Sequence, residues 1–143
     1  MLKGIDPVLS GELLKILDEM GHGDQLLLVD RNYPAAASGK PLVRLGDVSV
    51  LRAAEAILSV FPLDSFIEHP LERMEVNDDE SIVTENQAAL LELARAGHDK
   101  PLEYGVIRRL DFYERARQAY AVVHTLESQP YGCFILQKGV VFD

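Results

Sequence analysis

The segment MGHGDQLLLVD, residues 20–30, places a histidine between two glycines directly before a short apolar run. The run from Gln25 to Asp30 is too short and too continuously apolar for a surface helix, and it predicts a strand buried on both faces. Strands of this kind belong to sheets that helices cover on both sides. The segment therefore predicts an α/β fold.

Helical and strand-like patterns alternate on both sides of this segment. We expect helices over residues 7–20, 50–61, 78–97 and 112–118, and strands over residues 42–45, 70–76, 104–110, 120–126 and 133–136. This alternation predicts one domain, residues 1–143, with helices packed on both sides of a central, mainly parallel or mixed sheet.

Capping residues set the expected helix starts. Asp6 precedes a proline and predicts the start of the first helix, and Ser49 is the expected cap of the second. The acidic run 78–80 predicts the start of the third helix, because the helix dipole favours negative charge there. Asp111 and Glu114 have the spacing of a capping box, which predicts the start of the fourth helix at residue 112.

Composition restricts the class of protein. The chain has 143 residues, of which 48 % are hydrophobic and 26 % charged, as in an ordinary soluble domain. A net charge of −9 argues against binding to nucleic acid or anionic lipid. The single cysteine, Cys133, excludes an internal disulfide and a cysteine metal cluster. No stretch resembles a signal peptide or a membrane span, so we expect a cytoplasmic protein with no nucleic-acid or membrane partner.

His22 is the leading candidate for acid/base chemistry. The flanking glycines leave almost no neighbouring side chains to bury it, and imidazole exchanges protons near neutral pH. The alternative is a solvated loop histidine, or one that interacts only with the carboxyl end of the preceding helix.

Asp30 ends the buried strand, and ligands of open α/β sheets gather at the carboxyl ends of strands. It could accept hydrogen bonds from two sugar hydroxyls or orient a catalytic group. The alternative is that it only forms a turn with Asn32 and Tyr33. A straight strand would hold His22 and Asp30 about 20 Å apart. They share a site only if the glycine-flanked loop folds back, if the strand is short or bent, or if a second subunit intervenes.

Arg109 and Tyr131 complete the first set of candidates. Arg109 lies at the end of an expected strand and could bind a hydroxyl or carboxylate, or pair with Asp111 or Glu114. Tyr131 lies in an expected turn and could exchange a proton with a substrate oxygen, or lie at a subunit contact.

The chain has no HExxH, GxGxxG, Walker-type or GxSxG motif, so we expect neither a metal nor a cofactor.

Four sets of residues, in order along nearly the whole chain, resemble the RbsD/FucU family of fucose mutarotases and ribose pyranases. They are MLKGI at 1–5 with ELLK at 12–15, EMGHGD at 19–24 with Asp30, Arg109 with FYERA at 112–116, and YGC at 131–133 with KGV at 138–140. The ribose branch generally has histidine at the position of Arg109, so the resemblance favours the fucose branch.

The resemblance implies an RbsD-like three-layer fold and an isomerase that interconverts the anomers of a monosaccharide, with neither cofactor nor metal. It implies that His22 acts as acid/base, that Asp30 and Arg109 bind the sugar, and that Tyr131 contributes from a neighbouring subunit. It also implies a homodecameric ring with sites at subunit contacts, which would ease the separation of His22 and Asp30.

Cys133 departs from the family pattern, which has asparagine at this place. An amide offers two donors and an acceptor, whereas a thiol is a weak donor and a weak acceptor. One hydrogen bond to the sugar would then be lost or replaced by water.

The sequence leads to a mutarotase hypothesis in which His22 and Tyr131 transfer protons while Asp30, Arg109 and Cys133 contact an L-fucose-like pyranose. The alternative is a non-catalytic sugar-binding or sugar-transport accessory protein. A third interpretation is a structural ring protein in which the loop histidine only fixes a subunit contact.

Overall fold

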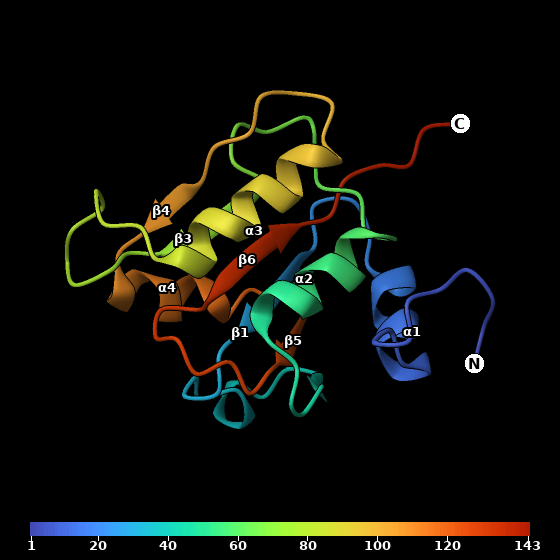
Figure 1. Ribbon diagram of the computed structural model, residues 1–143, viewed down its shortest axis with the longest axis horizontal. Helices are drawn as coiled ribbons and strands as arrows, with labels where there is room; N and C mark the ends of the chain where they lie inside the picture. The colour runs from blue at the N-terminus through green and yellow to red at the C-terminus, as the bar shows by residue number, and fades with distance from the viewer.

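A six-stranded mixed sheet forms the centre of the structure, a computed structural model that describes residues 1–143 (Figure 1). The strands are β1 (Gln25–Val29), β2 (Leu42–Arg44), β3 (Leu71–Met74), β4 (Gly105–Ile107), β5 (Ala121–His124) and β6 (Phe134–Gln137). Their order across the sheet is β2-β5-β1-β6-β3-β4. Only β6 runs against the others, since it pairs antiparallel with both β1 and β3.

Helices cover both faces of this sheet, as the sequence predicted. They are α1 (Gly11–Glu19), α2 (Val50–Leu58), α3 (Glu85–Ala96) and α4 (Arg109–Ala116), with a short 3₁₀ helix, η1 (Ala36–Ser38). No helix has both the length and the apolar character that crossing a membrane would require.

Alternate residues of β1 enter different cores. Leu26 and Leu28 join a cluster of 22 buried residues that includes side chains of α1, α2 and α3. Leu27 and Val29 join a cluster of 12 that includes Phe112 of α4. Figure 1 shows α2 and α3 on the near side of the sheet and α4 beyond it. The continuous apolar run is explained by this arrangement, because a strand covered on both faces buries every side chain.

The direction of β6 determines which segments meet at each edge of the sheet. Because β6 is antiparallel, its first residues lie at the carboxyl end of β1, where Phe134 pairs with Leu28. Its last residues lie at the amino end of β1, where Gln137 pairs with Gln25. The YGC segment therefore lies near Asp30, and the KGV segment lies near the His22 loop.

The start of α1 was predicted wrongly. The helix begins at Gly11 with Ser10 as its cap, since the Ser10 hydroxyl accepts from the Leu13 N–H at 3.2 Å. The Asp6 carboxylate instead binds the guanidinium of Arg52 in α2, with two contacts of 2.7 Å. Asp6 therefore joins the amino-terminal segment to α2 and caps nothing in α1.

The starts of α3 and α4 also differ from the prediction. Thr84 caps α3 and forms a capping box with Gln87, whereas Asp79 binds Ser81 within a turn. The first turn of α4 begins at Arg109, and Arg108 occupies the cap position without a side-chain hydrogen bond. The strands begin within a residue of their predicted starts and are mostly shorter, and β4 ends three residues before its predicted end.

Candidate functional site

His22 lies in the loop at the amino end of β1, with its side chain 49 % exposed. Its Nε2 atom is 3.1 Å from Oδ2 of Asp64, which is itself only 2 % exposed. The ring of Phe66 packs against the imidazole at a centroid distance of 5.5 Å. The prediction of an accessible imidazole is confirmed, but its carboxylate partner was not predicted.

Asp64 accepts hydrogen bonds from three directions. Besides His22, the Phe66 N–H donates to Oδ1 at 3.0 Å and the Gln137 amide donates to Oδ2 at 2.9 Å. Burial by itself raises the pKa of the Asp64 carboxyl, but these hydrogen bonds outweigh it and lower the pKa below its ordinary value. Asp64 is therefore a buried, ionised acceptor.

The closing segment, residues 138–142, holds the His22 loop in place. Gly23 N–H donates to the Lys138 carbonyl, and Lys138 N–H donates to the Asp24 carbonyl, both at 2.8 Å. The Lys138 ammonium also donates to the carbonyl of Leu17, at 2.6 Å, and to two further carbonyls at the end of α1. A Cβ at Gly139 would lie 2.7 Å from the Cα of Asp64, so only glycine permits this close approach.

Asp30 lies at the opposite, carboxyl end of β1 and is 5 % exposed. Its Oδ1 accepts from the Asn32 N–H at 3.0 Å, as the turn interpretation expected. Its Oδ2 accepts from the Gly132 N–H at 3.1 Å and lies 3.7 Å from the sulfur of Cys133. A carboxylate has about four acceptor positions, so these contacts leave room for a further donor.

Cys133 is buried against Asp30. Burial raises the pKa of its thiol well above the ordinary value, and the negative charge of Asp30 raises it further. The thiol is thus neutral and can only donate weakly to the carboxylate.

Tyr131 occupies the turn before β6, as predicted, and has a left-handed backbone with φ of 63°. Such a conformation costs a non-glycine residue about 1–2 kcal/mol, so neighbouring contacts must hold it. Its carbonyl accepts from the buried amide of Gln87 in α3, at 3.3 Å. Its hydroxyl donates to the side-chain oxygen of Asn77, at 2.8 Å. Gln87 and Asn77 were not singled out in the sequence, where no motif marks them.

Arg109 is exposed at the first position of α4, directly after β4. The ion pairs with Asp111 or Glu114 that its alternative interpretation required are absent, and Glu114 pairs with Arg117 instead. Because β4 is three strands from β1, Arg109 lies at the same edge as Asp30 but about 14 Å along it.

The predicted site residues thus form two groups in one chain. Asp30, Tyr131 and Cys133 lie together, with Arg109 further along the same edge of the sheet. His22 lies at the opposite edge, beside Asp64, which was not predicted. Within one chain the strand neither bends nor shortens enough to unite His22 with Asp30, and the loop does not fold back.

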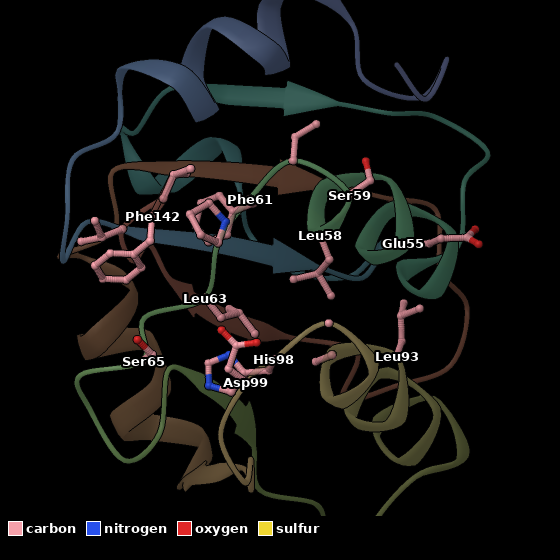
Figure 2. Close-up of a pocket in the computed structure, with 16 residues that line it drawn as sticks. Glu55, Leu58, Ser59, Phe61, Leu63, Ser65, Leu93, His98, Asp99 and Phe142 are labelled. Carbon is pink, nitrogen blue, oxygen red and sulfur yellow. The ribbon is translucent and has the colours of Figure 1, made fainter. Parts of the chain in front are cut away.

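A cavity of about 450 Å³ lies between α2, α3 and residues 140–142, and Figure 2 shows both apolar and polar side chains lining it. None of the predicted site residues lines it. It borders the His22 end through Phe142, whose ring packs with Phe66 at 6.2 Å. No group of three or more histidine, cysteine, aspartate or glutamate side chains is arranged to hold a metal ion.

Comparison with known proteins identifies the family to which this chain belongs. Residues 3–141 match the RbsD / FucU transport protein family. The chain belongs to the RbsD/FucU family.

Relatives within the RbsD/FucU family match along their full length. The L-fucose mutarotase of Glaesserella parasuis is 42 % identical over 141 residues, which are 98 % of this chain and 96 % of that protein. The crystal structure of protein Atu2016 has a TM-score of 0.94 and 39 % identity, covering 99 % of this chain and 97 % of the other. The fucose mutarotase of Streptococcus pneumoniae, solved with L-fucose, has a TM-score of 0.88 and 38 % identity, covering 99 % and 100 %.

Proposed function

We propose that this protein is a cofactor-independent mutarotase that interconverts the α and β anomers of a monosaccharide, an L-fucose-like pyranose. Its support is full-length similarity to L-fucose mutarotases, including one solved with L-fucose. The observation in the structure that carries the proposal is the half-exposed His22 imidazole, bound through one nitrogen to a buried carboxylate.

Anomer exchange requires two proton transfers. A base takes the proton of the anomeric hydroxyl while an acid protonates the ring oxygen, and the ring opens, rotates at the aldehyde carbon and closes on its other face. In our proposal His22 is the main acid/base and Tyr131 performs the opposing transfer. Each positioned transfer contributes roughly 10²–10⁴ in rate. Asp30 and Arg109 orient the sugar hydroxyls, and Cys133 acts on the sugar through its weak contact with the Asp30 carboxylate.

The site is proposed to lie between two copies of the chain, where His22 of one copy meets Asp30, Tyr131 and Arg109 of the next. Both edges of the sheet expose apolar side chains that such a contact would cover. Phe66 and Phe142 are 62 % and 70 % exposed beside His22, and Leu110 and Leu126 are 71 % and 46 % exposed at the other edge. Contacts between unlike surfaces form a ring when the rotation between neighbouring copies closes, which fits the ring that the family resemblance implies.

Anomer exchange measured by NMR on L-fucose and D-ribose tests this function. The wild type should accelerate exchange of L-fucose more than that of D-ribose, and His22→Ala should reduce the acceleration by roughly 10²–10⁴-fold. His69→Ala is the matched control, because His69 is also a partly exposed histidine and carries no role in the proposal.

Three outcomes would contradict the proposal. Equal exchange by wild type and His22→Ala would remove His22 from the mechanism. Sugar binding without exchange above buffer would favour the non-catalytic sugar-binding protein, and absence of any sugar binding would favour the structural ring protein.

A further inference from the structure

We propose that Asp64 is the positioning residue of the acid/base, keeping a proton on Nε2 of His22 so that Nδ1 is the nitrogen that exchanges protons with the sugar. The part that concerns the sugar rests on the proposed function. The part that concerns the histidine stands on the geometry of the loop alone.

The first step concerns the contact between Asp64 and His22. Nε2 and Oδ2 are 3.1 Å apart, within hydrogen-bond distance. An ionised carboxylate has no proton to donate, so the shared proton must belong to Nε2. The lowered pKa of Asp64 agrees, because the carboxylate stays ionised throughout the neutral range.

The second step concerns how firmly Asp64 is held. The Phe66 N–H fixes Oδ1, and the Gln137 amide fixes Oδ2 together with His22. The orientation of the Gln137 amide is itself determined, because its oxygen accepts from the Gln25 amide at 3.1 Å. The carboxylate therefore has one orientation, with its Oδ2 directed at the imidazole.

The third step concerns the nitrogen that remains. With the proton on Nε2, a neutral imidazole carries its free lone pair on Nδ1. Nδ1 makes no hydrogen bond in the structure, and the side chain is 49 % exposed. An oxygen of a bound sugar can thus reach an unoccupied base, while the buried carboxylate stabilises the imidazolium that forms after proton transfer.

Replacing Asp64 by asparagine should reverse this arrangement. The Phe66 N–H requires an oxygen at Oδ1, which places the asparagine NH₂ at the position of Oδ2. The Gln137 amide, which donates to Oδ2 in the wild type, must then turn over together with the Gln25 amide so that its oxygen accepts from this NH₂. An NH₂ facing Nε2 donates to it, so the proton of His22 moves to Nδ1. The reactive nitrogen would then lack its lone pair, although no group that contacts the sugar has changed.

Nitrogen-15 NMR of the histidine ring, in the full-length protein, tests the proposal together with anomer exchange. The wild-type signal of His22, assigned by its loss in His22→Ala, should be that of the Nε2–H tautomer at pH 8. In Asp64→Asn the Nδ1–H tautomer should increase, and exchange should fall about 10–100-fold while sugar affinity stays within about twofold. Asp24→Asn removes the same charge from the His22 loop itself without touching the imidazole, since the Asp24 carboxylate accepts only from the Gly21 N–H. It should leave both readouts unchanged.

The outcomes separate this inference from the proposed function. An Nδ1–H tautomer in the wild type overturns the role of Asp64 even if Asp64→Asn fails to fold. Unchanged exchange in a folded Asp64→Asn protein also overturns it, while the mutarotase function stands. Absence of exchange in the wild type overturns the function, and the tautomer measurement, which needs no sugar, still decides the role of Asp64.

Discussion

Asp30 shows that a structural and a functional interpretation of one residue are compatible. The same carboxylate that closes a turn on the Asn32 N–H also accepts from the Gly132 N–H, 102 residues later in the chain. Its structural contacts fix its position at the edge of the sheet, which is what a sugar-binding group requires. The turn contact was visible in the sequence, whereas the contact with Gly132 depends on where β6 inserts.

Cys133 should be chemically inert in the native protein, because only the thiolate reacts and burial raises the pKa of this thiol. At pH 8 we expect almost no reaction with Ellman's reagent over minutes, and release of one equivalent after guanidinium is added. The readout is unambiguous, because Cys133 is the only cysteine of the chain. Rapid reaction of the native protein would show that the contact with Asp30 opens in solution.

At the scale of elements, hydroxyl side chains cap α1, α2 and α3. Ser10, Ser49 and Thr84 each accept from a backbone N–H three residues later. Of these, only Ser49 was predicted. The acidic residues that were predicted to begin α1 and α3 make other contacts: Asp6 binds Arg52, and Asp79 binds Ser81. A local cap signal cannot reveal that a carboxylate is already bound by a residue distant in sequence.

Thr84→Ala should destabilise the protein by about 1 kcal/mol, the usual cost of losing a helix cap. The substitution removes the hydroxyl that accepts from the Gln87 N–H, whereas residue 84 keeps the backbone N–H that donates to the Gln87 side chain and orients it toward the Tyr131 turn. Urea unfolding measures the change. Thr84→Ser retains the hydroxyl and should unfold close to the wild type, and an equal loss in both variants would contradict the capping explanation.

The layered α/β fold could be predicted from the sequence because the continuous apolar run of β1 indicates a strand that is buried on both faces. The position of Asp64 could not. Its partners come from the loop before β1, from its own turn and from the end of β6, and only the folded sheet brings them together. Likewise, β6 was recognised as a strand, but its antiparallel insertion between β1 and β3 has no local signature.

At the scale of the whole molecule, one chain carries two incomplete halves of the proposed site at opposite edges of its sheet. Tyr131 shares an edge with Asp30, so the residue that must come from another copy is His22. The expectation that Tyr131 and His22 belong to different subunits stays a prediction, and the structure adds that Asp30 goes with Tyr131.

Mixed oligomers test this division. His22→Ala and Tyr131→Phe should each be nearly inactive alone. If the subunits of the two variants are dissociated, mixed equally and reassembled, about one quarter of the contacts should pair an intact His22 with an intact Tyr131. Anomer exchange should therefore recover to about a quarter of the wild-type rate. A mixture of His22→Ala with the double variant should recover nothing, and the same result for the first mixture would locate the site within one chain.

Lys138 has a practical consequence for studying this protein on surfaces. Its ammonium closes the end of α1 beside the His22 loop by donating to the Leu17 carbonyl and its neighbours. Acylation of this nitrogen, by amine coupling to a biosensor chip or by an amine-reactive dye, would take the donor away from those carbonyls. Thiol coupling is also unsuitable, because Cys133 is buried. Immobilisation is better directed to a biotin or other handle at Met1, which is fully exposed.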